Sequence, residues 1–221
     1  MNAEQARFNM IEQQIRPWEV LDANVLDLLA VVRREDYVPD ALRQLAFVDM
    51  QLPLRESGAR GQCMLEPKVE ARLLQASYLQ RHESVLEIGT GSGHMAALLA
   101  HQAQQVLTVE IVGELADAAA SRLASCGVIN VRVLTGDGAL GMPGQAPFDA
   151  IVLSGSVAQV PQRLLAQLKV GGRLIAVIGD EPMMRATLVE RLGDDDYRQT
   201  VLFDTVTPRL LGFDEPSRFR F

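Results

Sequence analysis

Five short apolar runs, separated by stretches with helical spacing, constrain how this chain folds more than any other feature. The runs are four or five residues long, are rich in β-branched residues and are bounded by glycine, aspartate or polar residues; they are residues 85–88, 106–109, 131–134, 150–153 and 174–178. Strands that alternate with helices form a parallel sheet covered by helices on both faces. The pattern therefore predicts a doubly wound α/β fold.

The whole chain, residues 1–221, is expected to form a single domain with three parts. Residues 1–60 have apolar residues at helical spacing and predict a helical N-terminal cap, whereas residues 66–180 contain the α/β core. The remainder, residues 181–221, predicts a helix over Met183–Leu192 and then a late antiparallel strand over Thr200–Val206. A chain of 221 residues is long enough for one well-buried core and too short for two full domains.

The charge balance bears on the kind of partner. The chain has 21 lysines and arginines against 28 aspartates and glutamates, which gives a net charge of −7. A protein with this balance is repelled by a phosphate backbone unless it carries a local basic patch. The densest basic pair, Arg33 and Arg34, is followed at once by Glu35 and Asp36. We therefore expect no nucleic-acid partner.

The sequence also bears on the compartment. Its first residues are polar and lack the apolar segment of a signal peptide, and no apolar run approaches the roughly 18 residues of a membrane span. Cys63 and Cys126 lie far apart, without a second cysteine or a histidine at ligand spacing. This predicts reduced thiols, no disulfide framework and no metal site. We expect a cytoplasmic protein without a membrane partner; the pattern leaves its oligomeric state open.

A glycine-rich loop directly follows the first apolar run. Glu87 and Ile88 lead into Gly89–Gly93, and the helical stretch His94–His101 comes next. Glycines let a backbone turn tightly and approach a ligand, and a helix N-terminus presents free N–H groups to it. Glu110 ends the second strand, seventeen residues beyond Gly93, where a carboxylate accepts hydrogen bonds from both hydroxyls of a ribose. The glycines could serve only to form turns. The order of strand, glycine loop and helix instead predicts a site that binds a nucleotide-type ligand.

The spacing of the loop favours S-adenosylmethionine (SAM) over a dinucleotide. A dinucleotide fingerprint needs a small residue where this chain has His94. SAM has no pyrophosphate and carries an ammonium, a carboxylate and a sulfonium group. Glu87 is expected to hold the ammonium, directly or through water, and the backbone of the loop to bind the carboxylate. The expected loop residues are Gly89, Thr90, Gly91 and Gly93.

The third strand is followed by a second glycine-containing turn. Asp137 is expected to reach the adenine amino group of SAM, with Gly138 beside it. The sequence Pro147-Phe148-Asp149 then opens the fourth strand, whose carboxyl end faces the same ligand crevice. The predicted cofactor is thus SAM, with S-adenosylhomocysteine as its product.

These motifs together resemble the protein-L-isoaspartate O-methyltransferase family. The resemblance is carried by Val85–Gly93, Gly136–Gly138 and Ala146–Asp149, by Arg34–Pro39, which is similar to the family's PREXFVP segment, and by Ala46–Asp49, which is similar to its AYxD segment. It covers roughly residues 9–180. The resemblance implies a mostly parallel, seven-stranded, Rossmann-like methyltransferase fold with an N-terminal helical extension. It also implies a repair enzyme that methylates the α-carboxylate of isoaspartyl residues in damaged proteins.

The chain departs from the family on the side of the methyl acceptor. Family members carry a GQTISQP-like segment whose serine is associated with the catalytic site, and Leu65 stands at that position here. The resemblance implies that Cys63, Met64, Leu65 and Glu66 line the acceptor side, with Ser154 and Ser156 opposite. We assign no catalytic residue.

Three functions stay open on these residues. The first is methylation of isoaspartyl carboxylates in proteins or peptides, which the resemblance favours. The second is methyl transfer to a different acceptor, which the altered segment around Leu65 permits. The third is a SAM-binding protein without turnover.

Overall fold

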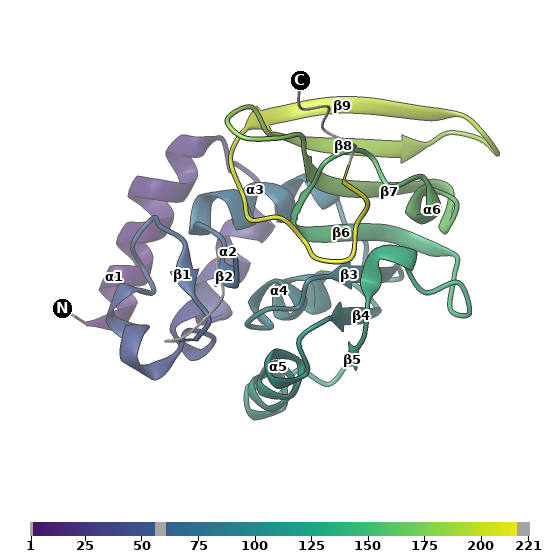
Figure 1. Cartoon of the computed structure of the whole chain (residues 1–221). Coiled ribbons are helices and arrows are strands. Elements are labelled where there is room, and N and C mark those ends of the chain that lie inside the picture. Colours follow the sequence, from purple (N-terminus) through teal and green to yellow (C-terminus); the bar gives the residue numbers. More distant parts are fainter. Residues whose placement is uncertain (1, 56–60, 216–221) are drawn as a thin grey trace, which may run out of the picture.

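The computed structural model describes residues 2–55 and 61–215 and is built around a seven-stranded sheet (Figure 1). The strands are β3 (Ser84–Ile88), β4 (Gln105–Glu110), β5 (Val131–Thr135), β6 (Phe148–Val157), β7 (Leu168–Ile178), β8 (Arg185–Arg191) and β9 (Tyr197–Asp204). Their order is β5-β4-β3-β6-β7-β8-β9, with β3 to β7 parallel and β8 and β9 joined by antiparallel pairing. All five apolar runs lie in β3 to β7, so the predicted parallel sheet is confirmed.

Helices cover both faces of the sheet. They are α3 (Pro67–Ser77), α4 (His94–Gln102), α5 (Gly113–Ser125) and α6 (Gln162–Leu165). Val85 and Val106 share one hydrophobic core with α3, α4 and α5. Leu86 and Leu107, their neighbours in the strands, belong to a second core with α6 on the opposite face. Adjacent residues of a strand point to opposite faces, and the doubly wound architecture is confirmed.

The N-terminal cap packs against α3 and α4 (Figure 1). Its elements are α1 (Ala3–Met10), a π-helical turn η1 (Ile11–Ile15), α2 (Ala23–Val31), and the 3-10 turns η2 (Arg16–Trp18), η3 (Arg34–Asp36) and η4 (Asp40–Leu45). The cap also contains β1 (Leu52–Pro53), which pairs with β2 (Cys63–Met64). The predicted helical character holds for most of this part, with a short two-stranded sheet added. Residues 1, 56–60 and 216–221, which the predicted cap and C-terminal part include, lie outside the described residues.

The chain order of the strands creates a switch point in the sheet. From β3 the chain adds β4 and β5 on one side, and then crosses to add β6 and β7 on the other. In open α/β sheets, ligands bind outside the carboxyl ends of the strands at such a point. The carboxyl ends of β3 and β6 therefore mark where a site is expected.

The predicted helix over Met183–Leu192 is wrong. Residues Arg185–Arg191 form β8, which pairs antiparallel with β7 on one side and with β9 on the other. Ala186, Leu188 and Glu190 favour helices when considered locally, but pairing on both edges and burial of Ala186–Val189 override that preference. The predicted late strand lies close to β9, which spans Tyr197–Asp204 rather than Thr200–Val206.

After β9 the chain returns to the carboxyl edge of the sheet. We call residues 207–213 the C-terminal strap. It is tied to β6 through Ser156: the Ser156 N–H donates to the Pro208 carbonyl at 2.7 Å, the Leu210 N–H donates to the Ser156 carbonyl at 2.9 Å, and the Ser156 hydroxyl donates to the Thr207 carbonyl at 2.9 Å. The strap therefore crosses the expected site (Figure 1).

Within residues 2–55 and 61–215, the longest α-helix is α5 with 13 residues, and none is long and apolar enough to cross a bilayer.

A matched pair of isoleucines tests how the central sheet contributes to stability. Ile151, in β6, is fully buried, whereas Ile129 is 95% exposed. We expect Ile151→Ala to lower the free energy of unfolding by about 2–5 kcal/mol, because it leaves a cavity in the core. Ile129→Ala is expected to change it by less than about 0.5 kcal/mol. Urea denaturation of both variants measures this, and equal losses would contradict the described packing.

Candidate functional site

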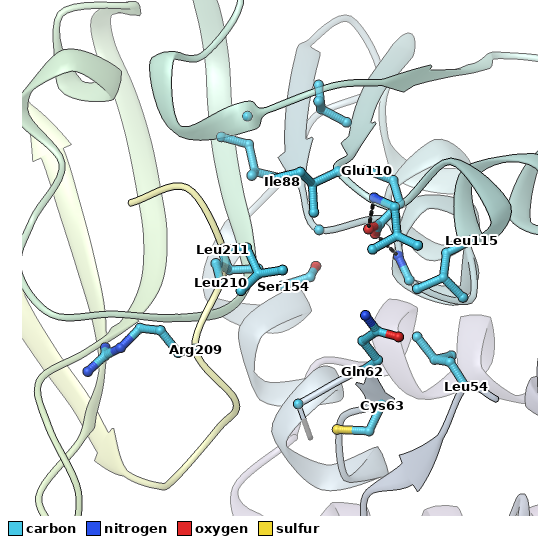
Figure 2. A pocket seen from close by; sticks show the side chains of 17 residues that line it. Leu54, Gln62, Cys63, Ile88, Glu110, Leu115, Ser154, Arg209, Leu210 and Leu211 are labelled. Atoms are coloured by element: carbon cyan, nitrogen blue, oxygen red, sulfur yellow. Dashed lines mark hydrogen bonds between the residues drawn. The ribbon is translucent and has the colours of Figure 1, made fainter. Parts of the chain in front are cut away.

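A small cavity lies at the switch point, between the sheet, the cap and the C-terminal strap (Figure 2). Its volume is about 80 Å³, less than the roughly 300 Å³ at which ligand pockets begin. The lining residues are Leu54, Gly61, Gln62, Cys63, Ile88, Gly89, Gly91, Val109, Glu110, Ile111, Val112, Leu115, Gly138, Ser154, Arg209, Leu210 and Leu211. The strap contributes Arg209, Leu210 and Leu211 to the lining and narrows the cavity.

The glycine loop adopts the backbone that its sequence suggests. Gly89, Gly91 and Gly93 have positive φ values of 92°, 52° and 89°, which L side chains rarely adopt. A Cβ on Gly89 would lie 2.8 Å from Leu210 Cδ2, so glycine here lets the strap approach the loop. Gly93 precedes α4 as its N-cap and does not line the cavity. The Gly89 N–H donates to the Val109 carbonyl and the Gly93 N–H to the Thr90 carbonyl, both at 2.9 Å. Within the described residues, the loop amides of Thr90 and Ser92 are the ones without such a partner.

Glu110 lies at the end of β4, where its carboxylate holds the loop in place. One oxygen accepts the Gly91 N–H at 2.9 Å and the other accepts the Val112 N–H at 3.0 Å (Figure 2). Each carboxylate oxygen has more than one acceptor site, so both can accept a further donor from the cavity. Glu110 thus lines the cavity with acceptor sites to spare, and its contact with a ribose stays a prediction.

Glu87 lies beneath the cavity and does not line it. It is fully buried, and its two oxygens accept the hydroxyls of Thr108 and Ser154, both at 2.7 Å. Thr90 extends the network, because its hydroxyl lies 2.6 Å from that of Thr108. Burial raises the pKa of Glu87 to about 8, although the two hydroxyls oppose the shift. Ser154 lines the cavity and connects it to Glu87, so a ligand ammonium would reach Glu87 through Ser154 or a water molecule.

The second glycine turn contributes one lining residue. Gly138 faces the cavity and packs against Ile88, where an added Cβ would overlap the isoleucine side chain. Asp137 is exposed and does not line the cavity; it accepts the Ala139 N–H at 2.9 Å. The strap passes so close that a Cβ on Gly212 would overlap the Asp137 carboxylate. Asp137 thus lies against the strap and outside the cavity lining, and its contact with the adenine amino group stays a prediction.

Of the four residues expected on the acceptor side, the structure brings Cys63 to the cavity. Met64 and Leu65 are 4% and 5% exposed and pack in the core of the cap instead. Glu66 precedes α3 and accepts the Gln51 amide at 3.2 Å. Burial, together with the nearby Glu66, raises the pKa of Cys63 to about 11, so its thiol stays neutral.

The two serines after the fourth strand have different surroundings. Ser154 lines the cavity and donates to Glu87. Ser156 is fully buried and does not line the cavity, because its hydroxyl holds the Thr207 carbonyl of the strap.

Other lining residues were not assigned from the sequence. Leu54, Leu115, Leu210 and Leu211 are apolar side chains that line the cavity with Glu110 (Figure 2). Ile111 also lines the cavity. No local pattern identifies them as site residues, because they come from the cap, from α5 and its preceding turn, and from the strap. The one sequence signal is Leu210-Leu211, a pair of adjacent leucines in the C-terminal stretch.

The charges at the cavity distinguish between cofactors. Glu110 is the acidic lining residue, and the basic one, Arg209, points away, where its guanidinium contacts Asp180 at 2.5 Å and the Gly179 carbonyl at 3.0 Å (Figure 2). A diphosphate would therefore meet no cation. The residues fit a cofactor with a ribose and a positive charge. In the described part of the chain, no three His, Cys, Asp or Glu side chains group as metal ligands. The fold and site together define the class of SAM-dependent methyltransferases with a Rossmann-like sheet.

Within that class, the chain belongs to the protein-L-isoaspartate(D-aspartate) O-methyltransferase (PCMT) family, whose model matches residues 5–207. Similar proteins named protein-L-isoaspartate O-methyltransferase occur in Rhodopseudomonas palustris (42% identity; 92% of each chain covered) and in Myxococcus xanthus (46% identity; 72% of this chain and 74% of that one). The cofactor of this family is SAM.

Solved structures show the same fold. A protein-L-isoaspartate O-methyltransferase structure has a TM-score of 0.79 at 24% identity, covering 94% of this chain and 66% of that chain. A structure from Plasmodium falciparum, described as a protein of this family in complex with S-adenosyl-L-homocysteine, has a TM-score of 0.74 at 17% identity and covers 95% of this chain and 99% of that one. The predicted seven-stranded methyltransferase fold is confirmed.

The raised pKa of Glu87 makes stability depend on pH. Its folded pKa of about 8 exceeds the ordinary value of 4.5, so the folded state binds the proton more tightly than the unfolded state. Stability from this group is present at low pH and falls as pH rises from about 4.5 towards 8. We expect Glu87→Gln, which stays neutral, to flatten this decline and to melt at a higher temperature than the wild type above pH 8.

Thermal melting between about pH 5 and pH 9 measures the effect, within the range where ordinary carboxyls are ionised. Asp27→Asn, which removes an exposed carboxylate on α2, is the control and is expected to follow the wild-type profile. A Glu87→Gln profile parallel to that of the wild type would contradict the assignment.

Proposed function

We propose that this chain transfers a methyl group from SAM to a carboxylate of isoaspartyl or D-aspartyl residues in proteins and peptides. One observation supports the proposal: Gly89, Gly91 and Glu110 line the same cavity as Cys63, the one member of the predicted acceptor strip that reaches it. Gln62 from the cap lines it beside Cys63. A cofactor and an acceptor bound to these residues would lie next to each other, as an in-line displacement requires.

The cofactor side is proposed to work through Glu110 and the loop. Glu110 accepts the ribose hydroxyls, and the amides of Thr90 and Ser92 in the loop bind the carboxylate of the cofactor. Ser154, whose hydroxyl donates to Glu87, offers its oxygen as an acceptor to the ammonium group. Ile111 and Leu115 provide apolar contacts for the adenine ring beside Gly138. When bound, SAM supplies an electrophilic methyl group.

The acceptor carboxylate needs no general base, since it attacks as an anion. The protein contributes by holding the reacting groups in line and by excluding water. Gln62 is the lining side chain whose amide can donate hydrogen bonds to such a carboxylate, because the Ser154 hydroxyl already donates to Glu87. Leu65 is absent from the lining, so orientation of the acceptor is assigned to Gln62 rather than to the position of the family's serine.

A different acceptor is the second candidate, and Glu66 favours it. Glu66 lies close enough to Cys63 to raise the pKa of that thiol, so the negative charge of Glu66 acts on the acceptor side of the cavity. Such a charge repels an anionic acceptor, whereas it does not repel a neutral or cationic one.

The first test compares methyl transfer from labelled SAM to an isoaspartyl peptide and to its ordinary aspartyl twin. We expect labelling of the isoaspartyl peptide alone, because the cavity admits a carboxylate in a specific position. Labelling of neither peptide, with SAM bound, would overturn the proposed acceptor. The second candidate and the loss of turnover would then be separated by offering small acceptors.

The role of Glu110 is tested by Glu110→Ala. We expect SAM binding, measured by calorimetry, to weaken by about tenfold or more, because charged hydrogen bonds to the ribose are lost. Asp117→Ala, which removes an exposed carboxylate from α5, is the matched control and should leave binding unchanged. Equal affinity of wild type and Glu110→Ala would contradict the assignment.

We also propose that the protein acts in the cytoplasm. Cys63 and Cys126 are both free thiols in the structure, which suits a reducing compartment. Cell fractionation with a tagged chain tests this.

A further inference from the structure

The polar wall on the acceptor side of the cavity depends on a second side chain, which does not line the cavity itself. β1 pairs with β2, and the pairing continues one residue further, because the Leu54 N–H donates to the Gln62 carbonyl at 2.9 Å. Arg55 follows Leu54 and therefore lies beside Gln62. Gln62 lines the cavity, whereas Arg55 is outside the lining and contacts Gln62 from behind.

The guanidinium of Arg55 fixes which way the Gln62 amide is turned. Its Nε and Nη2 both donate to Gln62 Oε1, at 3.2 and 2.6 Å. A guanidinium has donors only, so the amide oxygen must face it and the NH₂ group is turned to the other side. Figure 2 shows the amide nitrogen directed into the cavity, on the side of Ser154. Within residues 2–55 and 61–215, no acceptor takes up this NH₂ group.

Arg55 is itself held from the cofactor side of the cavity. Its Nη1 donates to the carboxylate of Glu114, in the first turn of α5, which directly follows the lining residues 110–112. The side chains of Arg55 and Glu114 are 33% and 80% exposed, and a pair this exposed contributes little to stability. The three bonds of Arg55 instead set one orientation of its guanidinium, and through it one orientation of the Gln62 amide.

The NH₂ group in the cavity determines which kind of acceptor fits beside it. Two N–H donors suit a group with oxygen lone pairs, such as a carboxylate, and oppose an ammonium group, which has donors only. Without Arg55 the amide can rotate and present its oxygen, and the glutamine side chain must be ordered anew whenever an acceptor binds. We propose that Arg55 is a positioning residue that holds the Gln62 NH₂ group towards the acceptor and thereby selects a carboxylate over an amine. The inference rests on the proposed function, which supplies the carboxylate.

A double-mutant cycle on methylation of the isoaspartyl peptide measures this coupling. We expect Gln62→Ala to lower kcat/KM about tenfold or more, because a hydrogen bond to a charged group is lost. Arg55→Met is expected to lower it about threefold to tenfold in the wild type, but less than about twofold in the Gln62→Ala background. An equal loss in both backgrounds would mean that Arg55 acts by its charge on the substrate, which overturns the proposal.

Two further variants control for charge and shape. Arg81→Met makes the same change of net charge at an exposed position outside the cavity lining and is expected to leave kcat/KM unchanged. Gln62→Glu keeps the acceptor for Arg55 but replaces the NH₂ group by an oxygen, so we expect it to lower kcat/KM at least as much as Gln62→Ala. Wild-type activity of Gln62→Glu overturns the selection of a carboxylate.

The fold and the cofactor site of Arg55→Met are checked separately. Because the Arg55 pair is exposed, the melting temperature is expected to fall by less than about 3 °C. Binding of S-adenosylhomocysteine, measured by calorimetry, is expected to stay within about twofold of the wild type. Larger losses in both measurements would assign Arg55 a general structural role and overturn the proposal.

NMR separates this inference from the proposed function, because it needs no substrate. In ¹⁵N-labelled protein, the side-chain NH₂ signal of Gln62, identified by its loss in Gln62→Ala, reports how rigid the amide is. We expect a rigid amide in the wild type and in Arg81→Met, and a mobile one in Arg55→Met. Equal mobility in all three overturns the role of Arg55, even if the isoaspartyl peptide is methylated. If the wild type methylates neither peptide, the proposed function fails, and the NMR result alone decides whether Arg55 holds the amide.

Discussion

A buried ion pair between Arg34 and Glu70 joins the cap to the core, and the geometry of the site depends on it. Arg34 is 2% exposed, and its guanidinium lies 2.5 Å from the Glu70 carboxylate. Its other donors meet the carbonyls of Ala46 and Leu65 at 3.1 and 2.7 Å. Glu70 also lies 2.8 Å from Nδ1 of His94, the first residue of α4. Burial disfavours the charged carboxylate, but His94 and Arg34 outweigh it and hold the pKa of Glu70 below its usual value. Removing one partner of such a pair costs about 3–5 kcal/mol.

This pair also explains why the acceptor strip departs from its expected arrangement. Arg34 fixes the Leu65 carbonyl, and Met64 pairs with Leu52 across the small sheet. The side chains of Met64 and Leu65 then pack in the core of the cap, which leaves Cys63 facing the cavity. A leucine at this position is stabilised by burial, whereas a serine hydroxyl there would need a partner. The family's hydroxyl is therefore replaced by packing, and the polar side chain left for the acceptor is Gln62.

The sequence predicts those parts of the molecule whose pattern lies within a short stretch of the chain. β3 and its glycine loop are examples, because strand, turn and helix follow one another within residues 84–102. Glu110 is predictable for the same reason, since it ends the adjacent strand. The direction of β8 and the burial of Ser156 depend on contacts with distant segments, namely β9 and the C-terminal strap. The strap itself has no periodic pattern, and its close approach requires glycine at positions 89 and 155, which is visible only once the chain is folded.

The surroundings of the cavity suit a reaction that removes charge. Methyl transfer from a sulfonium to a carboxylate consumes one positive and one negative charge, so it is favoured where water is excluded and the local dielectric is low. Leu54, Leu115 and Leu210 provide apolar walls, and the strap narrows the opening. The acidic groups nearby are satisfied without cations: Glu110 by two backbone N–H groups, and Glu87 by two hydroxyls. A cationic donor is therefore attracted to this site, while no fixed positive charge competes for the acceptor carboxylate.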